Sequence, residues 1–149
     1  MVTRLGVIAE EAGVFPASEL PSMISPFFSG EETHLWLVAT KGDGTVVGFT
    51  YSQEEKFTDA TWNLRCIAVH PEFHRQGMGK ALLSATEKEL ETEQQARLVV
   101  IDTVGNDEFA GQAKFYSQGG YKEVARIPDF WGDGEDKLTF WKRVRPVDA

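Results

Sequence analysis

The segment "LRCIAVHPEFHRQGMGKALL", residues 64–83, changes its hydrophobic period part way along. Up to Val69 the residues alternate in character, which predicts a strand over residues 61–69, whereas apolar residues recur at helical spacing from Met78 to Ala85. The connection between these two patterns contains Gly77, and no acidic residue lies between Glu72 and Glu87. A strand, a glycine-containing loop and a helix in this order present free backbone N–H groups to an anion. The sequence therefore predicts an anion-binding site where this helix begins.

The other segments predict an α+β fold with a mixed, mostly antiparallel sheet flanked by helices. The expected order is a strand, a helix, three strands, a helix, a strand, a helix and two strands, with parallel pairing where the two later helices cross over. Ser18 is expected to cap the first helix and Pro26 to break it. The expected strands are residues 4–11, 34–40, 45–52, 61–69, 96–102, 121–127 and 137–144, the helices lie within residues 16–30, from residue 78 and over residues 108–118, and a loop spans residues 128–136.

Composition narrows the class of protein. The 149 residues are expected to form a single domain, residues 1–149, with a substantial core. The net charge of −8 repels nucleic-acid phosphate, so no nucleic-acid partner is expected. Because no apolar run is long enough to cross a bilayer and the lone Cys66 fits a reducing compartment, a cytoplasmic protein without a membrane partner is expected. The three histidines lie at no metal-ligand spacing, so no metal site is expected.

Three kinds of glycine loop fit the segment to different extents. A Walker A loop requires a glycine where the chain has His74, and a serine or threonine where an alanine follows the Gly-Lys pair, so this motif fails twice. A Rossmann dinucleotide loop fits better, because Gly77 and Gly79 follow a strand and Asp102 ends the next strand, where an acid can hold a ribose. Leu82, however, occupies the third glycine position. The glycines alone are also compatible with a tight structural turn.

Two segments resemble the GNAT family of N-acetyltransferases. The first, "IAVHPEFHRQGMGKALL", is similar to the family's acyl-CoA loop, in which a strand ending I-A-V-x-P leads to (Q/R)-x-x-G-x-(G/A) and a helix. The second, "NDEFAGQAKFYSQGGYKEVARIPDF", looks like the family's second cofactor segment, N…A…FYxxxGF. Together the resemblance covers residues 64–130, with both motifs in the order of the family.

The resemblance implies a GNAT-like acyl-CoA N-acyltransferase fold and an enzyme that uses acetyl-CoA as its co-substrate, without a metal. The acetyl group would pass to a primary amine of a small molecule or a peptide by direct attack, without an acyl-enzyme. A homodimer is compatible with this interpretation. Two alternatives remain open, a non-catalytic acyl-CoA-binding module and the less favoured dinucleotide-binding protein.

The resemblance also assigns roles to individual residues. Tyr116 would be the general acid that protonates the departing thiolate, because a phenol with a reference pKa of about 10 stays protonated at neutral pH. Asn106 would hydrogen-bond the cofactor and is expected to share one helical face with Tyr116. His74 departs from the motif, since the family has Gln or Arg there. The cofactor-binding residues implied by the resemblance are Ile67, Val69, His74, Arg75, Gln76, Gly77, Met78, Gly79, Lys80, Asn106, Ala113 and Phe115.

The sequence does not single out the base that deprotonates the attacking amine. Cys66 has no catalytic partner at recognisable spacing and is expected to behave as a small buried apolar residue. His34 begins a predicted strand and is interpreted as structural. Phe130 and Trp131 either receive a cationic amine or anchor their loop to the core. The residues considered as the base, none of them distinguished by its spacing, are Glu54, Glu55, Asp59 and His70.

Overall fold

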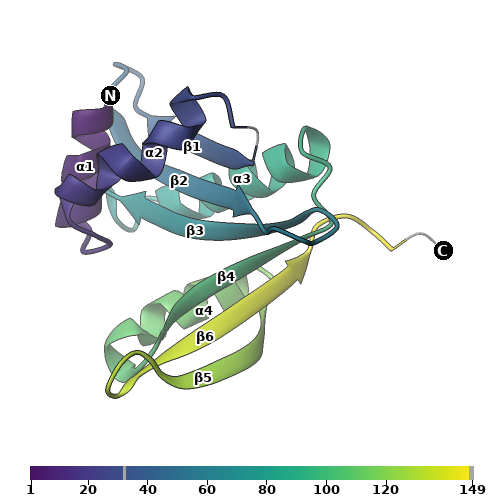
Figure 1. The fold of residues 1–149 in the computed structure, drawn as a ribbon. Coiled ribbons are helices and arrows are strands. Elements are labelled where there is room, and N and C mark those ends of the chain that lie inside the picture. Colours follow the sequence, from purple (N-terminus) through teal and green to yellow (C-terminus); the bar gives the residue numbers. More distant parts are fainter. Residues whose placement is uncertain (32, 148–149) are drawn as a thin grey trace. The chain divides into compact units, whose positions relative to one another are not determined.

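A computed structural model describes residues 1–31 and 33–147, whose elements are labelled in Figure 1. The chain divides into two compact units: unit 1 contains residues 1–54 and 65–89, and unit 2 contains residues 55–64 and the chain from residue 90 onward. The helices are α1 (Val2–Glu11), α2 (Leu20–Phe28), α3 (Met78–Thr92) and α4 (Ala110–Gln118), the strands are β1 (His34–Thr40), β2 (Val46–Glu54), β3 (Thr61–Val69), β4 (Leu98–Gly105), β5 (Lys122–Gly132) and β6 (Glu135–Arg143), and the short 3-10 turns are η1 (Ala17–Glu19), η2 (Pro71–Phe73) and η3 (Asp107–Phe109).

The strands pair in the order β1-β2-β3-β4-β6-β5. β1 is antiparallel to β2 around the predicted "KGDG" turn, and β6 is antiparallel to both β4 and β5. The parallel pair is β3 with β4, where residues 61–63 lie opposite residues 98–100. This pairing follows from the crossover through α3, because parallel neighbours need a long connection. The predicted mixed, mostly antiparallel sheet is confirmed, but the parallel pairing expected across α4 is wrong, because β6 lies between β4 and β5 and is antiparallel to both.

Unit 1 places helices on both faces of its strands (Figure 1). The apolar residues of α1 and α2 pack with Phe49, Tyr51 and Cys66 in one buried cluster. Thr50 lies between Phe49 and Tyr51 in β2 and therefore points to the opposite face, where its hydroxyl hydrogen-bonds Thr86 of α3 at 2.7 Å. One face of β2 thus packs against α1 and α2, and its other face holds α3.

The prediction of a strand over residues 4–11 is wrong, because this segment is helix α1. Leu5, Ile8 and Ala9 are 1%, 0% and 0% exposed and lie three and four residues apart, as a buried helical face requires. The chain therefore begins with two helices instead of a strand and a helix.

The predicted signals around α2 are also corrected. Ser18 lies within η1, and the residue that caps this turn is Pro16. Pro26 lies inside α2 and does not break it. Although proline removes one backbone donor, the helix continues past it, and the Ser29 N–H donates to the Ser25 carbonyl at 3.0 Å.

The buried face of α3 differs from the predicted stripe. Ala81 and Ala85 are exposed, whereas Leu82 and Leu83 are 4% and 3% exposed. Thr86 completes this face although it is polar, because its hydroxyl has a buried partner in β2. The leucines of α3, and not its alanines, therefore form the face that packs in unit 1.

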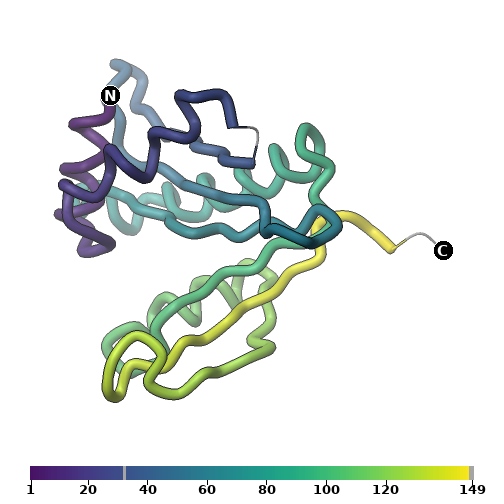
Figure 2. Tube along the Cα trace, in the orientation of Figure 1, coloured from purple at the N-terminus to yellow at the C-terminus, as the bar shows by residue number. Residues whose placement is uncertain are grey.

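Unit 2 contains α4 and the strands β4, β5 and β6. Thr103 of β4 donates its hydroxyl proton to the side-chain oxygen of Gln112 in α4 at 2.6 Å, on the same face as the buried Ile101. The predicted loop over residues 128–136 is wrong, because β5 continues to Gly132 and only a tight turn separates it from β6. This hairpin can be followed at the end of the chain in Figure 2.

None of the helices in residues 1–31 and 33–147 combines the length and the apolar character needed to cross a membrane.

Gly48 offers a direct test of the packing in unit 1. A Cβ atom at this position would lie 2.8 Å from the Ala68 carbonyl oxygen and 2.9 Å from Cδ1 of Leu82. Gly48→Ala is therefore expected to lower the free energy of unfolding by about 1–3 kcal/mol. Urea unfolding followed by circular dichroism measures the change. Gly42→Ala is the matched control, since a Cβ atom there meets nothing within 4 Å. Equal stability of the two variants would contradict the packing described.

Candidate functional site

The loop between β3 and α3 in unit 1 contains two residues with a left-handed backbone conformation. It begins with η2, and Arg75 and Gly77 further along have φ angles of 63° and 76°. Left-handed residues aim neighbouring N–H groups to one side, as in the backbone nests that bind anions. Because Arg75 carries a Cβ atom, its conformation stores roughly 1–2 kcal/mol of strain. The loop is thus held in a conformation that an unconstrained chain avoids.

The start of α3 is exposed and carries positive charge. Its first turn contains no acidic residue, and the Ala81 N–H makes a helical bond to the Gly77 carbonyl at 3.0 Å. The N–H groups of residues 78–80 therefore precede the hydrogen-bonded ladder of the helix. Lys80 is exposed in this turn, where a cation opposes the helix dipole unless an anion is bound. Among the other predicted loop residues, Arg75, Gln76 and Gly77 are exposed, and Met78 and Gly79 are half-buried.

His74, the departure from the family motif, is engaged within the loop. Its Nε2–H donates to the Val69 carbonyl at 2.7 Å, so this nitrogen closes the loop onto the end of β3. Of the two strand residues predicted to hold the cofactor, Ile67 and Val69 are both half-buried. The Val69 carbonyl already has a partner in His74.

The second predicted segment lies in unit 2. Asn106 is extended, with φ −136°, and its side-chain oxygen accepts a hydrogen bond from the Phe109 N–H at 3.2 Å. It therefore caps η3, and the prediction that it shares a helical face with Tyr116 is wrong, because α4 begins only at Ala110. Ala113 and Phe115 are half-buried in α4.

Tyr116 is packed inside unit 2. Its side chain is 6% exposed, and its ring lies 5.7 Å from Phe140 and 5.4 Å from Phe115 between centroids. Gly119 and Tyr121 donate their backbone N–H groups to the Tyr116 carbonyl, and the helix ends at residue 118, as predicted. The fold thus fixes the position of this phenol through packing on several sides.

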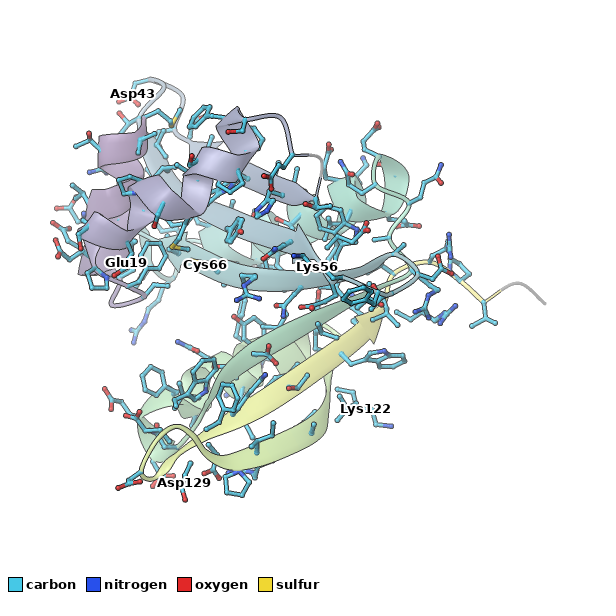
Figure 3. The ribbon with its side chains drawn as sticks, in the orientation of Figure 1. Glu19, Asp43, Lys56, Cys66, Lys122 and Asp129 are labelled. Atoms are coloured by element: carbon cyan, nitrogen blue, oxygen red, sulfur yellow. The ribbon has the colours of Figure 1, made fainter. Side chains whose placement is uncertain are left out.

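The aromatic and acidic residues of the β5–β6 hairpin interact with one another in unit 2. The Lys137 ammonium lies 4.4 Å from the centroid of Phe130, and the Trp131 indole N–H donates to the Thr103 carbonyl at 3.3 Å. Asp129, labelled near the end of the hairpin in Figure 3, accepts the Gly134 N–H at 2.8 Å. These contacts support the interpretation that the aromatics anchor the hairpin.

Sequence reasoning missed a polar network on unit 2. The Asn63 amide donates to Glu55 at 3.0 Å and to Asp102 at 3.3 Å, and the Thr139 hydroxyl donates to Asp102 at 2.7 Å. Lys137 lies 3.7 Å from Asp102. Glu55, one of the residues considered as the base, thus accepts a hydrogen bond from Asn63 of β3. Asp59, another residue considered, lies 3.9 Å from the Arg97 guanidinium.

A second polar chain in unit 1 involves His34. Its Nδ1 lies 2.7 Å from the Tyr51 hydroxyl, and its Nε2 lies 3.3 Å from the Glu31 carboxylate. Burial raises the pKa of Tyr51, so this phenol remains protonated at neutral pH. Trp36 stacks on Tyr51 with the ring centroids 4.4 Å apart. His34 therefore stabilises the β1–β2 pair.

Among the residues that the structure describes, no three His, Cys, Asp or Glu side chains gather as a metal ion would require.

The comparisons with known proteins agree with this geometry. A family model described as an acetyltransferase (GNAT) domain matches residues 31–123. No curated protein sequence matches the chain. Because the family model covers more than half of the chain, the chain belongs to the GNAT family of acetyltransferases. It is an N-acetyltransferase that uses acetyl-CoA as its co-substrate.

Many solved structures share the fold, and three of them are described here as examples. One, described as a GNAT-family acetyltransferase from Desulfovibrio desulfuricans, is 23% identical with a TM-score of 0.89, and the match covers 97% of this chain and 92% of that one. The ribosomal-protein-S18-alanine N-acetyltransferase from Escherichia coli is 23% identical with a TM-score of 0.77, covering 99% and 90%. An aminoglycoside 6'-N-acetyltransferase complexed with coenzyme A is 19% identical with a TM-score of 0.76, covering 99% and 93%. The GNAT-like α+β fold predicted from the sequence is confirmed.

Gly77 tests the conformation of the loop. Alanine at φ 76° is strained, so Gly77→Ala shifts the loop away from the conformation that exposes the start of α3. The Kd for acetyl-CoA, measured by calorimetry, is expected to rise roughly threefold to tenfold. Gly44→Ala is the strain-matched control, because Gly44 has φ 86° and open space around it in the β1–β2 hairpin. A similar loss of affinity in both variants would contradict a specific role of the loop.

Cys66 tests whether the chain has a nucleophilic thiol. Burial raises the pKa of this thiol to about 12, and Figure 3 shows it on β3, whose face here is covered by α1 and α2. Alkylation by iodoacetamide at pH 8 is expected to be on the order of a hundredfold slower in the folded than in the unfolded chain. Mass spectrometry over time gives both rates. Cys66→Ala should keep its kcat, and loss of activity in this variant would favour an acyl-enzyme.

Proposed function

We propose that the enzyme transfers the acetyl group to a primary amine of a small molecule or a peptide by direct attack. The observation that carries this proposal is the exposed start of α3, where the N–H groups of residues 78–80, Arg75 and Lys80 suit the pyrophosphate of coenzyme A. The structurally similar proteins act, by their names, on an alanine of a ribosomal protein and on an aminoglycoside, and these support an amine acceptor.

In the proposed reaction the neutral amine attacks the thioester carbonyl carbon, and the carbon–sulfur bond breaks. The leaving thiolate takes a proton from the Tyr116 hydroxyl, while the amine nitrogen loses its extra proton to a base or to water. The packing of Tyr116 between aromatic rings supports this role, because a catalytic acid has to be held in one orientation. The buried thiol of Cys66 supports direct attack rather than an acyl-enzyme.

We also propose that the enzyme is cytoplasmic, since its one cysteine, Cys66, is a buried free thiol.

Tyr116→Phe tests the general acid. Because the phenyl ring keeps the packing and loses the proton, kcat is expected to fall by at least about a hundredfold with little change in the Kd for acetyl-CoA. Thiol release from acetyl-CoA is measured with a panel of primary amines. Tyr121→Phe is the matched control, since Tyr121 is a second buried phenol of unit 2 and is 4% exposed.

Two results would contradict the proposal. Equal losses in the Tyr116 and Tyr121 variants would indicate a packing effect, and the general-acid role would then be wrong. Tight binding of acetyl-CoA without thiol release for any amine would instead favour a binding module without turnover.

A further inference from the structure

His70 lies between the end of β3 and the loop that leads to α3, all within unit 1. Its backbone N–H donates to the Val47 carbonyl of β2 at 2.8 Å, and its side chain is buried, with the residue 8% exposed. The ring also packs edge-on against Phe73, with the centroids 6.1 Å apart. A buried imidazole in this place needs partners for both of its nitrogens.

Both ring nitrogens have such partners. The Glu72 backbone N–H donates to Nδ1 of His70 at 3.2 Å, so His70 is the cap of η2. Since a donor faces Nδ1, the neutral ring carries its proton on Nε2. Nε2 lies 2.5 Å from a carboxylate oxygen of Glu11 and donates to it. The two contacts together fix the tautomer and the orientation of the ring.

Glu11 is the last residue of α1, a place where the helix dipole disfavours a negative charge. Its contact with the His70 N–H offsets this cost. α1 itself is anchored in the core of unit 1 through Leu5 and Ile8. The Glu11 contact therefore ties the ring to a rigid part of the unit.

Backbone hydrogen bonds continue from His70 into the loop. The Phe73 N–H donates to the His70 carbonyl at 2.8 Å, and the His74 N–H donates to the Pro71 carbonyl at 3.2 Å. His74 then returns to β3 through its bond to Val69. A continuous series of hydrogen bonds thus runs from Glu11 through His70 and η2 to the residue before Arg75.

We infer that His70 is a positioning residue for the acetyl-CoA loop and that Glu11 holds His70 in place. The inference rests on the proposed function, in which this loop binds the pyrophosphate. Loss of either contact lets η2 adopt other conformations, and the apparent affinity for acetyl-CoA falls with the population of the competent loop. The chemical step is untouched once the cofactor is bound.

Variants of His70 separate its two contacts. In His70→Asn the side-chain oxygen can still accept the Glu72 N–H, because asparagine is a good cap, but it is too short to reach Glu11. In His70→Gln the longer amide can reach Glu11, and the cap is lost. Each variant loses one of the two hydrogen bonds and is expected to raise the KM for acetyl-CoA about fivefold, the factor that corresponds to one typical hydrogen bond, with kcat unchanged.

Glu11→Ala completes a double-mutant cycle with His70→Asn. Because both variants break the same contact, the double variant is expected to bind acetyl-CoA no more weakly than His70→Asn alone. Glu11→Gln keeps an oxygen acceptor for Nε2–H and should restore most of the affinity. Glu10→Gln, the same change one residue earlier at an exposed position, is the control and should bind as the wild type does.

Calorimetric Kd values for acetyl-CoA, together with kcat and KM, distinguish the outcomes. An unchanged Kd in both Glu11→Ala and His70→Asn, or a fall in kcat with an unchanged KM, would overturn the positioning role. A wild-type chain that does not bind acetyl-CoA would instead overturn the proposed function on which this role depends. Thermal unfolding of each variant identifies any that are not folded, and Glu11→Ala, a truncation at an exposed position that is expected to fold, keeps the comparison decisive.

Discussion

Backbone N–H groups at the start of α3 need acceptors that the helix itself does not supply. The loop before the helix keeps this end exposed, through the left-handed Arg75 and Gly77 and through the absence of an acid in the first turn. The loop is held between two elements whose positions are fixed by packing, since Cys66 and Ala68 of β3 lie in the core and Thr86 of α3 bonds to β2. The proposed anion site on the surface of unit 1 therefore depends on contacts inside that unit.

The sequence predicted correctly those elements whose apolar residues recur at a clear strand or helix spacing. The strand over residues 61–69 coincides with β3, and the glycines after α4 end that helix as expected. The first segment was ambiguous, because Leu5, Val7 and Ala9 alternate as in a strand while Leu5, Ile8 and Ala9 follow helical spacing. Only packing against β2 and α2 makes one face of this segment the buried one, and that information is not local.

In the β5–β6 hairpin the error was reversed, because the structure has a strand where a loop was predicted. Proline, aspartate and glycine in residues 128–136 predicted a loop, yet β5 extends through most of this segment. Its pairing with β6 shifts register twice, and Asp129 adopts a φ of 55° within it. Irregular strands of this kind are built from bulges and from turn contacts such as the bond between Asp129 and Gly134, which propensity does not reveal.

In the candidate site, too, contiguous motifs could be identified from the sequence, whereas contacts between distant residues could not. The loop of residues 74–80 could be proposed because its chemistry is contiguous in sequence, and Tyr116 was indicated by the second motif; both assignments stay predictions. The contact of Glu11 with His70, and that of Asn63 with Asp102, join residues far apart in the sequence, so no spacing rule indicates them. Asn63 is only 5% exposed, and a buried amide requires a hydrogen-bond partner, which in this case lies on other segments of the chain.

The buried thiol of Cys66 has a consequence for an enzyme that consumes a thioester and releases a free thiol. A thiol takes an acyl group from a thioester only as the thiolate. Because Cys66 lies in the core and burial raises its pKa to about 12, we expect that the enzyme's own co-substrate does not acetylate it. This chemical inertness follows from packing alone.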